Sequence, residues 1–135
     1  MKVVIDTNVF VSSFFEGNPK RIIDLWKKGK ISLCLSKDIL DEHVDVLQRV
    51  GLGDEREIEE LLSLFAKGIN IIFTRKTPKL KVVKDDPDDD KFIKCAVALK
   101  AEVIITGDKA LKKIGEYRGI KILTPQQFLK AYKIR

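Results

Sequence analysis

Hydrophobic residues along the chain follow two kinds of pattern. Short, nearly continuous apolar runs rich in Val and Ile predict β-strands, at residues 2–5, 31–35, 69–73, 103–105 and 120–123. The segments between them place apolar residues three or four positions apart, which is typical of helices with one buried face. Strands that alternate with helices and lack a polar face predict a parallel sheet covered on both sides. We therefore expect an α/β three-layer sandwich with a central sheet of about five strands.

Capping residues and glycines mark where the predicted helices begin and end. Asn18 and Pro19 predict a helix that runs to about residue 28. Ser36 and Asp54 are the predicted N-caps of the next two helices. Further helices are expected at about 89–100, after Asp108 and after Thr124.

The length and composition of the chain fit one folded domain over residues 1–135. Hydrophobic residues make up 44% of the sequence, which is enough to form a core. No apolar run approaches the roughly 18 residues that span a membrane, and the amino terminus is charged too early for a signal peptide. Cys34 and Cys95 lie in apolar stretches without metal-ligand spacing, so we expect buried, reduced thiols. We expect a soluble, cytoplasmic protein that does not bind membranes.

Charge is distributed unevenly along the chain. The net charge is +6, although residues 85–90 are all aspartates apart from Pro87. Basic residues therefore dominate elsewhere, with runs at 27–30, 75–84 and 109–113. A basic surface beside concentrated acids suits a protein that binds phosphate backbones and keeps carboxylates for another task. On charge alone, a solvated surface without a binding role is the simpler interpretation.

Two aspartates directly follow predicted strands. Asp6 follows the first strand, with Asn8 close behind, and Asp108 follows the fourth strand after Thr106. In a parallel sheet, ligands bind beyond the carboxyl ends of the strands, where the strand order switches. Either aspartate by itself could simply cap the following helix. If the two strands are neighbours, however, both carboxylates overhang one crevice.

The run of aspartates precedes a predicted helix. Asp89 stands four residues before Ile93 and seven before Ala96, so helical geometry places it on the inward face of that helix. Asp88 and Asp90 are expected to turn away and reach water. An acid on a core-facing helix start is costly unless it caps its own helix or meets a cation.

The helix after Ser36 carries two further candidates. Its periodicity places Glu42 on the polar face, so from the pattern alone we expect a surface residue. His43 lies beside the apolar stripe and is expected to be a packed helix residue rather than a base or a metal ligand.

Several common catalytic patterns are missing from the sequence. It contains no glycine-rich phosphate loop, no Ser, His and Asp order that suggests a triad, and no cysteine nucleophile with a plausible base. A haloacid-dehalogenase phosphatase would need an aspartate where Asn8 stands, and a receiver domain would need one after the third strand, where the chain has Phe73 and Thr74. Clustered carboxylates without His or Cys form a hard oxygen-donor site, which suits Mg²⁺ or Mn²⁺ rather than zinc.

Four segments taken together resemble the PIN-domain ribonucleases. They are Val3-Val4-Ile5-Asp6-Thr7-Asn8, Ser36 with Glu42 six residues later, Asp86-Pro87-Asp88-Asp89 followed by Phe92-Ile93 and Ala96, and Ile104-Ile105-Thr106-Gly107-Asp108. They occur in order and span nearly the whole chain. Within that family, the chain is similar to the VapC ribonucleases, the toxins of toxin–antitoxin pairs.

The resemblance implies one catalytic pocket. Its expected acids are Asp6, Glu42, Asp89 and Asp108, with Asn8 and Thr106 as polar neighbours. This places Glu42 at the crevice, against the surface position that periodicity predicts. It also implies the strand order 3-2-1-4-5, which makes strands one and four neighbours. Because Asp88, Asp89 and Asp90 are consecutive, Asp90 is the fallback for the third acid.

The resulting hypothesis is a metal-dependent endoribonuclease that hydrolyses phosphodiester bonds of RNA. Asp6 and Asp89 are expected to bind Mg²⁺ or Mn²⁺ directly, and Glu42 and Asp108 to complete the site. The residues expected to bind the RNA backbone are Arg75, Lys76, Lys79 and Lys81.

The same resemblance implies a toxin role, with a cognate antitoxin protein as partner and a homodimeric assembly. Two alternatives stay open: an RNA-processing or ribosome-maturation nuclease of the same fold, and a non-catalytic module that binds nucleic acid. The presence of all four acids argues against the non-catalytic module, whereas nothing in the sequence separates a toxin from a processing enzyme.

Overall fold

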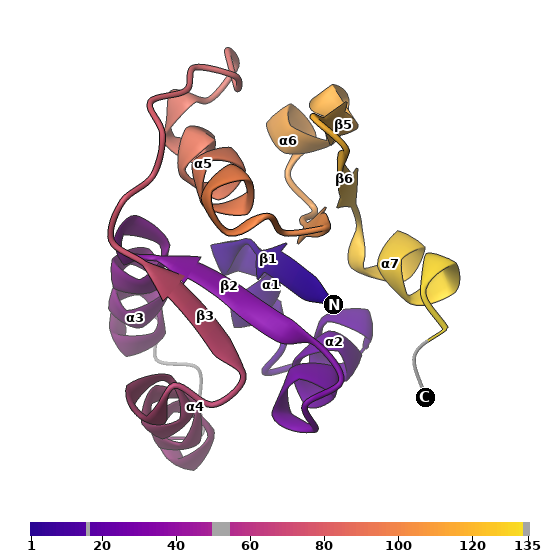
Figure 1. The fold of residues 1–135 in the computed structure, drawn as a ribbon. Helices are drawn as coiled ribbons and strands as arrows, with labels where there is room; N and C mark the ends of the chain where they lie inside the picture. Colours follow the sequence, from indigo (N-terminus) through magenta and orange to yellow (C-terminus); the bar gives the residue numbers. More distant parts are fainter. Residues whose placement is uncertain (16, 50–54, 134–135) are drawn as a thin grey trace.

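A parallel sheet forms the centre of the protein. The computed structural model describes residues 1–15, 17–49 and 55–133, and across these residues six strands form one sheet in the order β3-β2-β1-β4-β6-β5 (Figure 1). They are β1 (Lys2–Ile5), β2 (Ser32–Ser36), β3 (Ile71–Thr74), β4 (Val103–Ile105), β5 (Glu116–Tyr117) and β6 (Ile120–Leu123). Every neighbouring pair is parallel except β5 with β6. The predicted α/β sandwich and the order of its five expected strands are confirmed, with β6 as the fifth.

The sixth strand, β5, is missing from the prediction. It pairs antiparallel with β6 at one edge of the sheet. The connection is Arg118-Gly119, and both residues have positive φ, 49° and 83°, as a two-residue hairpin turn requires. A strand of two residues is too short to give a hydrophobic pattern, so the sequence offers only the turn as a signal.

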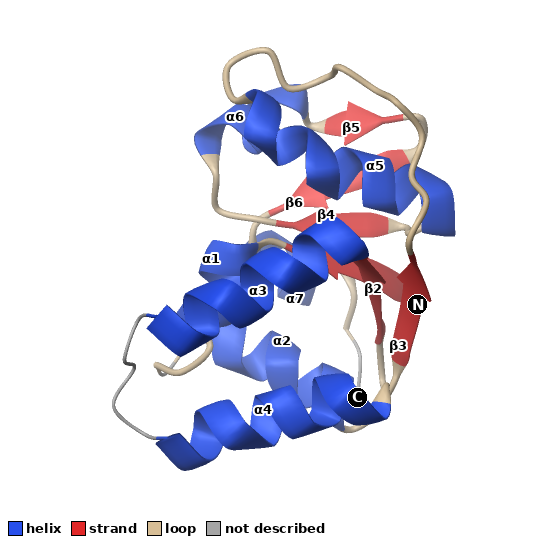
Figure 2. Cartoon of the chain, turned by 90° about the vertical axis from the view of Figure 1, so that its left-hand side faces the viewer, coloured by secondary structure: helices blue, strands red, loops and turns tan. Residues whose placement is uncertain are grey.

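Helices cover both faces of the sheet (Figure 2). They are α1 (Thr7–Ser12), α2 (Asn18–Lys27), α3 (Lys37–Arg49), α4 (Glu55–Lys67), the 3₁₀ turn η1 (Pro87–Asp89), α5 (Asp90–Leu99), α6 (Lys109–Ile114) and α7 (Pro125–Ala131). Helix α5 contacts the strands from β1 to β4, while α1 packs against α2 and α3, and α7 packs against α2.

Most helix boundaries agree with the predicted caps. Ser36 accepts a hydrogen bond from the backbone N–H of Ile39 at 3.3 Å, and Thr124 forms a capping box at the start of α7. The first predicted cap is wrong by one residue, because Gly17 is the N-cap of α2 and Asn18 is its first residue. Asp54 lies outside the described residues. Helix α1 was not expected, since its apolar residues follow β1 without a break in the pattern.

The central strands are completely buried. Every residue of β4 and residues 3–5 of β1 have no measurable exposure, which explains their continuous apolar sequence. On one side of the sheet, Phe10, Trp26 and Phe65 form an aromatic cluster with ring centroids 5.6–6.4 Å apart. Parallel pairing places β1 and β4 side by side, so the residues directly after them have defined positions. Cys34 and Cys95 are buried free thiols, as predicted.

Asp90 anchors the long segment between β3 and η1. Its Oδ1 accepts hydrogen bonds from the backbone N–H groups of Val82 and Val83, at 2.9 and 2.8 Å. A carboxylate that satisfies two backbone donors is a strong local tether. The first residue of α5 therefore holds residues 82 and 83 of this segment in place. Within the described residues, no helix is long and apolar enough to cross a membrane.

Candidate functional site

Asp6 lies where β1 ends and α1 begins. It is the N-cap of α1, and its Oδ1 accepts a hydrogen bond from the backbone N–H of Val9 at 2.8 Å. Its Oδ2 accepts a hydrogen bond from the hydroxyl of Thr106. Only 3% of Asp6 is exposed. Burial raises the pKa of Asp6; the two hydrogen bonds oppose this rise, and the nearby charges of Asp108 and Glu42 add to it.

Thr106 connects Asp6 to the second strand-end acid. The backbone N–H of Asp108 donates to the Thr106 hydroxyl oxygen at 2.9 Å, and that hydroxyl donates to Asp6. Asp108 is in turn the N-cap of α6, because its Oδ2 accepts from the N–H of Leu111 at 3.1 Å. The predicted neighbourhood of Asp6, Thr106 and Asp108 is therefore present in the structure. Both aspartates cap helices, and the Thr106 hydroxyl links them.

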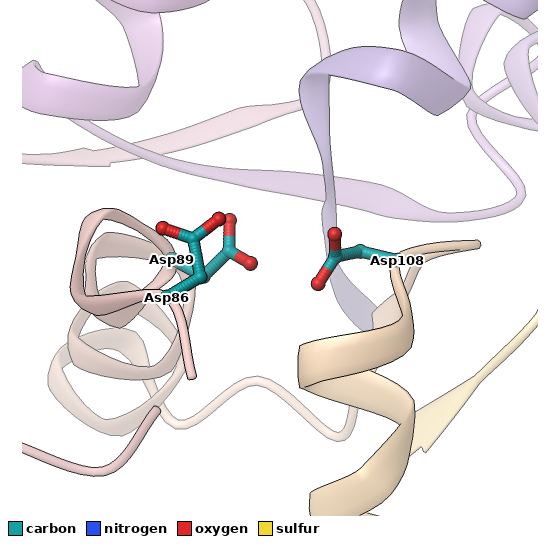
Figure 3. A group of neighbouring side chains, drawn as sticks. All are labelled: Asp86, Asp89 and Asp108. Carbon is teal, nitrogen blue, oxygen red and sulfur yellow. The ribbon is translucent and has the colours of Figure 1, made fainter. Parts of the chain in front are cut away.

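Two further acids, Asp86 and Asp89, come from the turn before α5. One carboxylate oxygen from each of Asp86, Asp89 and Asp108 lies within 4.8 Å of the others. Figure 3 shows Asp86 and Asp89 on the turn before α5, facing Asp108 at the start of α6. The Oδ2 atom of Asp89 is buried and has no hydrogen-bond partner among the described residues. Buried polar atoms are rarely left unpaired, so this oxygen is the most informative atom of the cluster.

The electrostatics of Asp89 reflect this crowding. Burial raises its pKa to about 8; hydrogen bonding to Asp108 and the charge of Asp108 add to the rise, followed by the charges of Asp86 and Asp6. Negative charge is therefore in excess at this point. Several carboxylate oxygens around an unpaired buried oxygen fit a hard divalent cation such as Mg²⁺ or Mn²⁺.

The predicted direction of Asp90 is wrong. Asp90 is buried instead of facing water, and it binds backbone N–H groups of the segment before η1. Asp89 faces the acids from the 3₁₀ turn η1, before α5 begins. Asp90 is the first residue of α5 and stands three residues before the buried Ile93, so its side chain lies on the inward side of the helix. The structure thus gives Asp90, the fallback, a structural role and leaves Asp89 in the cluster.

Glu42 lies on α3, close enough for its charge to act on Asp6. Its side chain is 27% exposed, which contradicts the surface position that periodicity predicted and agrees with the position that the resemblance implied. The Thr7 hydroxyl donates to its Oε1, and the ammonium group of Lys91 donates to its Oε2. Burial by itself would raise the pKa of Glu42, but the contacts with Lys91 and Thr7 outweigh it and the pKa is lowered. Lys91, which sequence reasoning missed, also lies 3.2 Å from Asp88.

His43 is a packed residue, as predicted. It is fully buried, its Nε2 lies 3.1 Å from the carbonyl oxygen of Ile5, and its Nδ1 lies 2.8 Å from the Thr7 hydroxyl. Burial lowers its pKa to about 3, so the imidazole is neutral at physiological pH. Its ring packs on Phe10 with centroids 4.4 Å apart. His43 is therefore a core residue of α3 that contacts β1 and α1.

The remaining candidates are Asn8 and the basic residues expected to bind RNA. Asn8 is exposed in α1. The exposed basic residues Arg75, Lys76, Lys79 and Lys81 lie along the segment before η1. Lys79 and Lys81 line a groove of about 890 Å³ whose other lining residues are Leu80, Val83, Lys84, Pro87, Asp90 and Lys94. The groove adds Lys84 and Lys94 to the four basic residues expected to bind RNA, and the acid cluster adds Asp86 to the four expected acids. Asp86 already stood in the motif, whereas Lys94 gave no signal.

Comparisons with known proteins agree on the kind of domain. The model of the PIN domain family matches residues 2–110. An uncharacterized protein of Methanocaldococcus jannaschii is 36% identical over an alignment of 147 residues, which covers 98% of this chain and 92% of that protein. Among solved structures, a chain of VapBC2 from Rickettsia felis, crystallised with a DNA fragment from its promoter, superposes with a TM-score of 0.56. The match covers 90% of this chain and 97% of that one at 14% identity, so it shows a similar fold only.

The raised pKa of Asp89 predicts how the stability of the metal-free protein depends on pH. The unfolded chain loses this proton near pH 3.8 and the folded protein near pH 8. The folded state therefore binds the extra proton between these values, and the free energy of unfolding should fall as pH rises through this window. Asp89→Asn should flatten that slope and raise the melting temperature at pH 8.5 by a few degrees, at about 4 °C for each kcal/mol of repulsion removed.

Thermal melts of chelator-treated protein at pH 5 and pH 8.5 measure this effect. Asp41→Asn is the matched control, because Asp41 is an exposed acid on α3 that pairs with Lys37. An Asp89→Asn variant that keeps the pH dependence of the parent would show that the charge of Asp89 is not under strain.

Proposed function

Because the chain belongs to the PIN domain family, we propose that it is a metal-dependent endoribonuclease that hydrolyses phosphodiester bonds of RNA. The observation that carries this proposal is the buried Oδ2 of Asp89, which has no hydrogen-bond partner in the described part of the chain. Asp89 faces Asp86 and Asp108 and lies near the buried Asp6. The acids come from three separate places: the end of β1, the start of α6 and the turn before α5. Such convergence is costly in a protein that does not use it, since the carboxylates repel one another.

In this proposal, Asp6 and Asp89 bind Mg²⁺ or Mn²⁺, and Asp108 and Glu42 complete the pocket. The arrangement adds Asp86 to the set, since its oxygen lies within 4.8 Å of those of Asp89 and Asp108. A bound divalent ion would polarise a phosphate oxygen and make water easier to deprotonate. A water nucleophile leaves a 5′-phosphate and a 3′-hydroxyl on the products.

Other residues of the chain hold the acids in position. The Thr106 hydroxyl fixes the Asp6 carboxylate, and the N–H groups of Val9 and Leu111 hold Asp6 and Asp108. Because these donors belong to well-packed elements, the carboxylates need little rearrangement when a cation or substrate arrives. Asn8 and Thr106 keep their proposed roles as polar neighbours of the pocket.

Positive charge along the segment before η1 supports RNA as the substrate. Lys79 and Lys81 line one groove with Lys84 and Lys94, and Arg75 and Lys76 are exposed on the same segment. Asp90 ties that segment to the start of α5, next to Asp89. A phosphate backbone lying along these cations would pass close to the acids. Only 7% of the residues are aromatic, so recognition would depend on backbone shape more than on base stacking.

We extend the proposal to a toxin of a toxin–antitoxin pair that acts as a homodimer with an antitoxin protein as partner. The shared fold with a chain of VapBC2 supports this role. An RNA-processing nuclease would use the same chemistry.

Replacing Asp6 tests the catalytic part of the proposal. Asp6→Asn should lower RNA cleavage by at least about 100-fold, because the variant removes a proposed direct ligand of the metal ion that would stabilise the transition state. The fold should persist, since the amide oxygen can still accept from Val9. Cleavage of an end-labelled RNA with Mn²⁺, and with chelator as a blank, measures the effect. Asp41→Asn should cleave like the parent, and parental cleavage by Asp6→Asn would contradict the assignment.

Salt dependence of RNA binding tests the basic groove. The variant with Lys79→Ala and Lys81→Ala should bind more weakly, and its slope of log affinity against log salt should be shallower by about 0.7 for each lost single-strand phosphate contact. Binding in chelator, where cleavage is suppressed, gives the slope. The control carries Lys37→Ala and Lys67→Ala, two exposed lysines on α3 and α4. Equal slopes for the two variants would place the RNA on another surface.

A further inference from the structure

Lys91 is an unusual residue in a pocket otherwise described by its acids. Its side chain is only 15% exposed, although lysines are rarely buried unless they are paired. The ammonium group contacts Oε2 of Glu42 and lies 3.2 Å from Oδ2 of Asp88. A positive charge is thus held between two carboxylates at the edge of the proposed metal pocket.

The contacts of Lys91 divide the acids into two groups. Glu42 has both oxygens engaged, one by the Thr7 hydroxyl and the other by Lys91. Asp89 has a buried oxygen without a partner among the described residues, and its cluster contains Asp86 and Asp108 but not Glu42. One side of the pocket therefore has unsatisfied negative charge, while the other side already contains its cation.

The start of α5 produces this division. Asp89 and Lys91 are two residues apart at the junction of η1 and α5, and they diverge toward different neighbours. Asp89 faces Asp108 at the start of α6, whereas Lys91 reaches Glu42 on α3. Asp88 is three residues before Lys91 and supplies its second carboxylate contact. The same turn thus presents an acid to one side and an ammonium group to the other.

We propose that Lys91 occupies the position of a second cation, so that the pocket binds a single divalent ion on the side of Asp86, Asp89 and Asp108. This inference rests on the proposed function and concerns the number of ions that the same site accepts. A divalent ion on Oε2 of Glu42 would have to displace the ammonium group or lie directly beside its charge. Glu42 then belongs to the pocket as the partner of Lys91 and not as a ligand.

Counting bound Mn²⁺ tests the proposal without any substrate. The electron paramagnetic resonance signal of free Mn²⁺, followed during titration of the purified full chain, gives the number of bound ions and their affinities. The parent should bind one ion. Lys91→Met should bind a second ion with a Kd within about tenfold of the first, and Lys91→Met combined with Glu42→Gln should return to one. Lys91→Arg, which keeps the charge, and Lys37→Met, which removes an exposed ion-paired lysine, should both bind one.

A parent that binds two ions with similar affinity would overturn the proposal, and so would a folded Lys91→Met variant that still binds one. Glu42→Gln in the parent background gives a test that does not require loss of Lys91, and it should keep the single ion within about threefold of its affinity. Loss of that ion would show that Glu42 is a ligand and would contradict the proposal. RNA cleavage by the same preparations separates the two hypotheses. A parent that binds one ion but leaves RNA intact would refute the nuclease and support the role of Lys91.

Discussion

The hydrogen bond from the Thr106 hydroxyl to Asp6 joins the two halves of the site. It depends on the pairing of β1 with β4, which also brings the Asp6 N–H to the carbonyl oxygen of Ile105 at 3.1 Å. The same hydroxyl accepts from the backbone of Asp108. This contact ties Asp6 to the backbone of Asp108, although the two carboxylates repel each other and the charge of Asp108 raises the pKa of Asp6.

The protein offsets its converging charges in several ways. Backbone N–H groups of Val9 and Leu111 bind Asp6 and Asp108, as helix caps do in many proteins. Lys91 neutralises the Glu42 side, whereas burial and the neighbouring carboxylates raise the pKa of Asp89. Among the described residues, these compensations leave one buried side-chain oxygen without a hydrogen-bond partner, Oδ2 of Asp89. The excess negative charge is therefore concentrated at one place, where a cation would be most strongly attracted.

Sequence patterns predicted those parts of the structure that depend on local rules. Buried strands have continuous apolar sequences, and the aspartates after β1 and β4 identified two acids of the candidate site. Glu42 and Asp90 were misjudged from periodicity because their positions depend on partners elsewhere: Lys91 for Glu42, and the N–H groups of Val82 and Val83 for Asp90. A helical pattern reports which face is apolar, but it does not report that another element covers the polar face. The resemblance to PIN domains corrected Glu42, and only the structure identified Lys91.

The central claim is that acids from separate elements form one cation site, and thermal melts with Mn²⁺ test it most directly. At a hundredfold excess over Kd, a ligand that binds only the folded state stabilises it by about 2.7 kcal/mol. Mn²⁺ should therefore stabilise the parent by about this amount, and Asp6→Asn, Asp89→Asn and Asp108→Asn by much less at the same concentration. An equal shift in the parent and all three variants would mean that the acids do not share a cation, and the account would lose its physical basis.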